Sequence, residues 1–133
     1  MKKELKHPDK LASTGAYSAA VEIDGWIFVS GQGPLDLATG EIRSGTIEAE
    51  TRLTLSHIRR ILETAGASMA DVVRCTCHLA DIRDFDRFNL VYAEHFPKPF
   101  PARTTVQSVL GGGIKVEIDC IARAPGKPHP THS

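Results

Sequence analysis

The chain has 133 residues, the size of one domain with a substantial hydrophobic core. Its 16 Lys and Arg residues balance 16 Asp and Glu residues, which argues against the basic surface of a nucleic-acid-binding module. No stretch approaches the roughly 20 apolar residues of a membrane span, and no apolar run typical of a signal peptide follows the N-terminus. We therefore expect a cytoplasmic protein without a nucleic-acid or membrane partner.

Residues 17–30 are predicted to form a β-hairpin, because Asp24-Gly25 is a strong type I′ turn signal between two β-prone runs. The second arm, Trp26-Ile27-Phe28-Val29, is apolar at every position. A strand with this pattern is expected to be covered on both faces.

A helix is predicted from an N-cap at Thr46 to about Gly66. Its apolar side would carry Leu53, Ile58, Ile61, Leu62 and Ala65, and its polar side Glu50, Arg52, Arg59, Arg60 and Glu63. Ser68 and Asp71 have the spacing of a capping box for one further turn.

The β-branched run over residues 72–79 predicts a further strand, and residues 84–95 predict a second helix. This helix is expected to bury Phe88, Val91, Tyr92 and Phe96, and Pro97 and Pro99 end it. The glycines at 111–113 lie between two β-prone runs, so residues 103–122 are predicted to form a second hairpin.

The resulting order ββαβαββ predicts an α+β fold, in which right-handed crossovers put two helices on one face of the sheet. The apolar second face would then be exposed, and a symmetric oligomer is the simplest way to bury it. We expect one domain over residues 1–123 and a disordered tail over residues 124–133.

Three cysteines, an odd number without a secretory signal, argue against a disulfide scaffold. Cys75 and Cys77 share one face of their strand, but no His or Cys pair follows at zinc spacing. We interpret them, like Cys120, as buried apolar side chains, and His57 as a hydrogen-bonded core or interface histidine. No metal site and no cofactor is expected.

Arg103 and Glu117 are the candidate catalytic residues, because the predicted hairpin would bring a guanidinium and a carboxylate together. Arginine can hold a planar carboxylate through two parallel hydrogen bonds. A neighbouring glutamate could direct water at an activated electrophile such as a protonated imine. The alternative is an ordinary ion pair between two strands.

The segment Ser30-Gly31-Gln32-Gly33 ends the apolar strand and could present a hydroxyl and backbone N–H groups to a ligand. The alternative for Ser30 is hydrogen bonding at the strand end. Tyr17 starts the first strand, next to Gly15, where an aromatic residue is more often part of a core or interface than catalytic.

Seven segments together resemble the reactive intermediate deaminase (Rid, or YjgF) family and run in the expected order from about Tyr17 to Ala122. They are Gly15-Ala-Tyr17-Ser, Ile27-Phe-Val-Ser30-Gly-Gln32-Gly-Pro34, Thr39-Gly40-Glu41, Ala67-Ser-Met-Ala-Asp71-Val-Val, Asn89-x-x-Tyr92, Pro101-Ala-Arg103 and Val116-Glu117-Ile118. The Pro-Ala-Arg and Glu-Ile elements are the most specific.

The resemblance implies a chorismate-mutase-like fold, a homotrimer with clefts between subunits, and cofactor-free hydrolysis of enamines or imines to 2-oxo acids and ammonia. In members with this activity, the arginine matching Arg103 holds the substrate carboxylate and the glutamate matching Glu117 positions water. Ser30 and Tyr17 match residues that line the pocket. We expect the backbone near Gly31 and Thr105 to fix substrate and water, with 2-aminoacrylate as a typical substrate.

Other functions stay open. The loop at 111–113 would permit a pathway-specific relative such as a 2-aminomuconate deaminase. A non-catalytic trimer could use the same arginine to bind 2-oxo acids. An endoribonuclease role, attached to some members of the family, fits poorly with the balanced charge.

Overall fold

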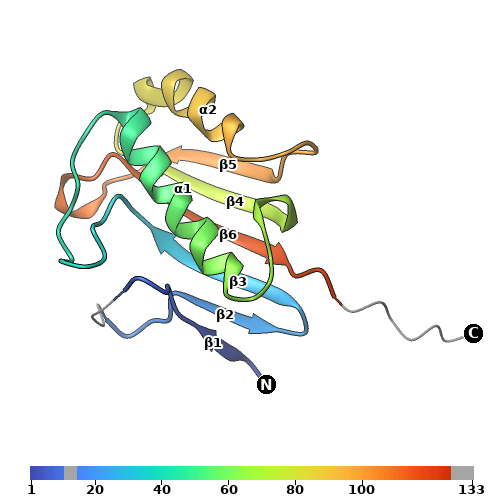
Figure 1. The fold of residues 1–133 in the computed structure, drawn as a ribbon. Helices are drawn as coiled ribbons and strands as arrows, with labels where there is room; N and C mark the ends of the chain where they lie inside the picture. Colours follow the sequence, from blue (N-terminus) through green and yellow to red (C-terminus); the bar gives the residue numbers. More distant parts are fainter. Residues whose placement is uncertain (11–14, 127–133) are drawn as a thin grey trace, which may run out of the picture.

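A computed structural model describes residues 1–10 and 15–126 and shows a six-stranded sheet with two α-helices on one face (Figure 1). The strands lie in the order β1-β2-β3-β6-β4-β5. They are β1 Lys3–Leu5, β2 Ala20–Ile23, β3 Trp26–Gln32, β4 Val72–Leu79, β5 Ala102–Gln107 and β6 Val116–Arg123. The helices are α1 Ile47–Glu63 and α2 Phe85–Glu94, with short 3₁₀ turns η1 Met69–Asp71, η2 Ile82–Asp84 and η3 Gly111–Gly113.

This architecture confirms the predicted α+β fold with both helices on one side, and it adds a strand that the sequence pattern does not reveal. β1 has only three residues and pairs with β2, placing Leu5 opposite Ala20. The predicted disordered tail falls largely on residues 127–133, which lie outside the described residues.

The elements defined by local signals form where they are predicted. Asp24 and Gly25 both have positive φ, 51° and 83°, as the type I′ turn between β2 and β3 requires. Thr46 Oγ1 accepts a hydrogen bond from the Ala49 N–H at 3.1 Å and caps α1. The Ser68 N–H donates to Asp71 Oδ2 at 2.8 Å, completing the predicted turn before β4.

The core lies between the two helices and the sheet. Alternate residues of the central strands point into it, because successive side chains of a strand face opposite sides. Fully buried examples are Ile27 of β3, Cys75, Cys77 and Leu79 of β4, Val116 and Ile118 of β6, Leu55, Ile58, Ile61 and Leu62 of α1, and Phe88 of α2.

The predicted hairpin over residues 103–122 is wrong. β5 pairs in parallel with β4, and β4 lies between β5 and β6. The connection from β5 to β6 passes the end of β4, where the Ser108 N–H donates to the Leu79 carbonyl and the Ala80 N–H donates to the Lys115 carbonyl. β6 alternates buried residues and pairs on both sides, so it occupies the centre, whereas β5 is an edge strand.

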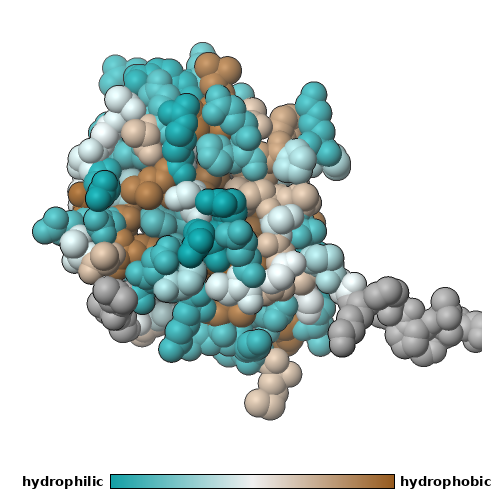
Figure 2. Space-filling model, viewed as in Figure 1, coloured by the Kyte–Doolittle hydropathy of each residue, from teal (hydrophilic) through white to brown (hydrophobic). Residues whose placement is uncertain are grey.

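The second face of the sheet has no helix over it in the described part of the chain. Trp26 and Phe28 of β3 are 40% and 42% exposed there, although Ile27 and Val29, which alternate with them, are buried. Figure 2 is drawn in the same view as Figure 1, with the helix side of the sheet towards the viewer, and shows hydrophilic residues dominating that side.

None of the described helices is long and apolar enough to cross a membrane.

Candidate functional site

Arg103 lies on the helix-covered face of the sheet, because its partner in register is the buried Cys75. The guanidinium carbon is 4.6 Å from the centroid of the Tyr92 ring on α2, and Nη1 donates to Asn89 Oδ1 at 2.8 Å. Stacking on an aromatic ring and one hydrogen bond restrict the orientation of the planar cation. Within residues 1–10 and 15–126, no ion pair includes Arg103. Its remaining N–H groups can therefore donate hydrogen bonds to an anionic ligand.

A cavity of about 380 Å³ borders the guanidinium. Its lining residues are Asn89, Tyr92, Ala93, Phe100, Pro101 and Arg103. A single cation among mostly apolar walls suits a small carboxylate, because weak solvation strengthens a charge-assisted hydrogen bond. Thr105 lies on the same face as Arg103, paired in register with the buried Cys77.

Glu117 lies on the opposite, open face, because it pairs in register with His78 rather than with a core residue. Its carboxylate covers Gly31: a Cβ placed on Gly31 would lie 2.9 Å from Glu117 Oε2. Glycine at this position therefore leaves the room that the carboxylate occupies. Ser30 is next to it, and its hydroxyl donates to the Ser18 carbonyl at 2.6 Å.

Tyr17 precedes β2, and the residue is 57% exposed. With Ser30 it lines a surface pocket of about 390 Å³ beside the β2–β3 hairpin. Tyr17 and Ser30 therefore border the same pocket, and Gly31 follows Ser30 directly in β3.

The structure thus divides the predicted site residues into two groups. Arg103 and Thr105 lie on the helix-covered face, whereas Glu117 lies against Gly31 on the open face. The expectation that Arg103 and Glu117 meet within one chain is wrong, and so is the alternative of an ion pair between them. A whole strand separates them, and the two-residue period of a strand sends their side chains to opposite faces.

The three cysteines are buried, as predicted. Burial raises the pKa of the Cys75 thiol to about 11 and that of Cys77 to about 12, and it also raises the pKa of Cys120. A thiol that stays protonated is a poor nucleophile and a poor metal ligand. In the described residues no cluster of His, Cys, Asp or Glu side chains is arranged to hold a metal ion.

His57 is a buried, hydrogen-bonded histidine, as predicted, and its partner is a second buried histidine, His7. His57 Nε2 is 2.8 Å from the Leu35 carbonyl oxygen, which can only accept, so Nε2 carries the proton. The Asp9 N–H donates to His7 Nδ1 at 3.0 Å, so the proton of His7 is on Nε2, which donates to His57 Nδ1 at 3.2 Å. Both rings are therefore neutral.

The sequence did not reveal the structural roles of three residues, Asn89, Tyr92 and Glu50. Asn89 and Tyr92 fix Arg103, and their i, i+3 spacing on α2 was a signal for a shared face. Glu50, predicted on the polar side of α1, is only 1% exposed. Its burial depends on partners distant in sequence, which periodicity does not reveal.

Comparisons with known proteins agree with this fold. The family model described as Endoribonuclease L-PSP matches residues 7–124. The 2-iminobutanoate/2-iminopropanoate deaminase of Bos taurus is 42% identical over 112 residues, covering 84% of this chain and 82% of that protein. The crystal structure of RidA from an Antarctic Psychrobacter superposes with a TM-score of 0.84 at 34% identity, covering 91% and 98% of the two chains. Escherichia coli TdcF with bound serine superposes with a TM-score of 0.81 at 31% identity, with the same coverage. The chain belongs to the RidA/YjgF family.

Proposed function

We propose that the protein hydrolyses enamine or imine intermediates of the 2-aminoacrylate type to 2-oxo acids and ammonia. Support comes from the guanidinium beside a small cavity and from relatives named as deaminases at about 40% identity. The serine bound in Escherichia coli TdcF is also a small molecule with a carboxylate beside a nitrogen-bearing carbon.

Arg103 would bind the substrate carboxylate. Its contacts with Asn89 and Tyr92 hold the guanidinium before a ligand arrives, which lowers the entropic cost of binding. The carboxylate partly neutralises Arg103, so the positive imine carbon can approach without a net excess of positive charge.

Glu117 would orient a water molecule and accept its proton as the water oxygen bonds to the imine carbon. The resulting carbinolamine then collapses: its nitrogen takes up the proton that Glu117 accepted, the C–N bond breaks and releases ammonia, and the hydroxyl proton passes to the Glu117 carboxylate as the C=O bond forms. The backbone at Gly31 and the Ser30 hydroxyl oxygen would help to hold the water and the substrate. This chemistry needs no redox partner, because carbon stays at the same oxidation level.

The observation that carries the proposal further is the separation of Arg103 and Glu117 on opposite faces of one sheet. A substrate a few ångströms across cannot contact both in one chain, so we assign the two residues of each site to different copies. The open face with Trp26 and Phe28 supplies an apolar surface for association. A closed homotrimer with sites between subunits fits these requirements.

A subunit-mixing experiment tests the shared site. Arg103→Ala and Glu117→Gln are each expected to be inactive in ammonia release from freshly generated 2-aminoacrylate. If the variants are unfolded together in equal amounts and refolded, about one site in four receives an intact arginine from one copy and an intact glutamate from another. Recovery of about a quarter of the parental activity is expected, and light scattering is expected to give the trimer mass.

Two outcomes would contradict parts of the proposal. Mixed variants that stay inactive although they co-assemble would place both residues of a site in one chain. A parent protein that binds 2-oxobutanoate but releases no ammonia would indicate a metabolite-binding trimer instead of an enzyme.

A further inference from the structure

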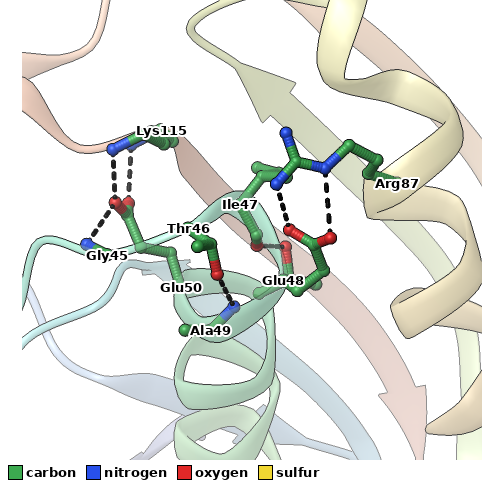
Figure 3. Close-up of polar contacts among 9 residues, drawn as sticks. Gly45, Thr46, Ile47, Glu48, Ala49, Glu50, Arg87 and Lys115 are labelled. Carbon is green, nitrogen blue, oxygen red and sulfur yellow. Dashed lines mark hydrogen bonds and ion pairs between the residues drawn. The ribbon is translucent and has the colours of Figure 1, made fainter.

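Glu50 is a buried acidic residue that the proposed chemistry does not use. It lies in the first turn of α1, and its side chain is completely buried. Oε1 accepts a hydrogen bond from the Lys115 N–H at 2.7 Å, and Oε2 accepts from the Gly45 N–H at 3.1 Å. The Lys115 ammonium is a third donor, 3.2 Å from Oε2 (Figure 3). A buried carboxylate with three donors is a well-satisfied and specific junction.

This junction lies at the start of the strand that carries Glu117. Lys115 immediately precedes β6, and Glu117 is two residues further along the strand. On its other side, the Lys115 carbonyl accepts a hydrogen bond from the Ala80 N–H at 3.0 Å, just beyond β4. Both backbone polar groups of Lys115 are therefore bound, one to α1 and one to the end of β4.

The segment before Lys115 is poorly suited to fix the strand by itself. Gly112 and Gly113 have positive φ, 68° and 75°, and glycine loses more backbone freedom on ordering than any other residue. A triple glycine has no side chains with which to anchor itself. The position of the first residues of β6 thus depends on contacts made from outside the loop, which are the pairing of Val116 with Leu79 of β4 and the hydrogen bonds of Lys115 to Ala80 and Glu50.

We propose that Glu50 is a positioning residue for Glu117: by holding Lys115, it sets where β6 begins and hence where the Glu117 carboxylate stands over Gly31. The expected effect on kcat rests on the proposed function, whereas the role of Glu50 in holding Lys115 does not. Arg103 is fixed by α2 through Asn89, so Glu50 affects the placement of the water and leaves the carboxylate-binding group unchanged.

Glu50→Gln is the informative substitution, because it keeps the size of the side chain but replaces one acceptor oxygen with an NH₂ group. If the amide oxygen accepts from the Lys115 N–H, the NH₂ group faces the Gly45 N–H and the Lys115 ammonium, which are both donors. The reverse orientation sets the NH₂ group against the Lys115 N–H. Either way, at least one donor loses its partner.

Two matched variants control for charge and for the ammonium. Glu48→Gln also removes an acid from the first turn of α1, but Glu48 pairs with Arg87, at 2.7 Å, and does not contact Lys115 (Figure 3). Lys115→Met removes the ammonium and keeps the backbone N–H that Glu50 holds. If Glu50→Gln does not fold, Glu50→Asp is measured in its place, since the shorter side chain withdraws the carboxylate from Lys115.

The measurements are kcat for ammonia release, Kd for 2-oxobutanoate, and hydrogen exchange of the amides at 114–118. For Glu50→Gln we expect kcat to fall on the order of tenfold to a hundredfold, as for a misplaced catalytic group. We also expect Kd to stay within about twofold and exchange at Lys115 to accelerate. Glu48→Gln and Lys115→Met are expected to stay within about threefold of the parental kcat.

A parental kcat in Glu50→Gln would overturn the inference, and so would a loss of 2-oxobutanoate binding equal to the loss of kcat, which would indicate general structural damage. An inactive parent protein would refute the proposed function instead. In that case amide exchange still decides the structural part: unchanged protection at Lys115 in Glu50→Gln would refute the role of Glu50 in fixing β6.

Discussion

Acid is expected to destabilise the protein through the paired histidines His7 and His57. Burial and the neighbouring ring lower the pKa of His7 from 6.5 to about 4, and burial also lowers the pKa of His57. A proton added to His7 Nδ1 would face the Asp9 N–H, and one added to His57 Nδ1 would face the proton of His7 Nε2. Protonation of His7 therefore breaks a partly buried hydrogen bond, and protonation of His57 breaks a buried one.

The sign and size of the effect follow from linkage. The unfolded chain binds a proton at His7 near pH 6.5, whereas the folded chain does so only near pH 4, so this stability is fully present above pH 6.5. It is lost as pH falls from 6.5 towards 4. Since one pKa unit is worth about 1.4 kcal/mol, the loss from His7 reaches on the order of 3 kcal/mol at pH 4. Asp9 moderates this loss, and Arg60 and Lys10 add to it.

The variant His7→Gln isolates this contribution, because the Gln NH₂ group can donate to His57 Nδ1 but does not titrate. The free energy of unfolding is measured for parent and variant between pH 7.5 and pH 4.5, at one protein concentration. Other groups that titrate are common to both proteins and largely cancel in the difference. The parent is expected to lose stability relative to His7→Gln as pH falls below 6.5. A difference that stays constant over this range would refute the reasoning.

Three further outcomes are expected. Arg103→Ala is expected to lower kcat/KM by the equivalent of about 2 to 5 kcal/mol in steady-state kinetics. Arg103→Lys is expected to retain only part of the parental kcat/KM, because the lysine ammonium is a point charge and lacks the planar fork of the guanidinium. Glu117→Gln is expected to bind 2-oxobutanoate normally in calorimetry while kcat falls roughly 100-fold or more, and turnover at the parental rate would remove its role as a base. Cys75→Ser and Cys77→Ser are expected to lower the melting temperature and to leave kcat unchanged, since both thiols are buried and protonated; a loss of kcat at parental stability would argue for a role of sulfur.

The elements that were predicted correctly have local signals, and the errors concern contacts between distant residues. The turn at Asp24-Gly25 and the cap at Thr46 each depend on a few adjacent residues, so the sequence pattern was sufficient. The partner of a strand is not encoded locally. The runs around Arg103 and Glu117 were both correctly predicted as strands, but their pattern does not reveal that β4 lies between them.

The same limit explains the candidate site. The alternation of side chains along a strand does not tell which of the two faces is the core face. Arg103 could be placed on the helix-covered face only by knowing that it pairs with the buried Cys75. Glu50 has a polar side chain at a position where the helical pattern permits exposure, and only the donors from Gly45 and Lys115 make its burial favourable. The roles of Arg103, Glu117, Tyr17, Ser30, Gly31 and Thr105 remain predictions.

The opposite orientation of Arg103 and Glu117 also has a thermodynamic consequence. When one ligand is held by groups from two copies, ligand binding and subunit association become a single linked equilibrium, in which each strengthens the other by the same factor. A 2-oxo acid at 100 times its Kd would add about 2.7 kcal/mol per occupied site to the stability of the assembly. Dilution would conversely weaken ligand binding before any subunit unfolds. The cell's supply of small carboxylates would then regulate how much of the protein is assembled.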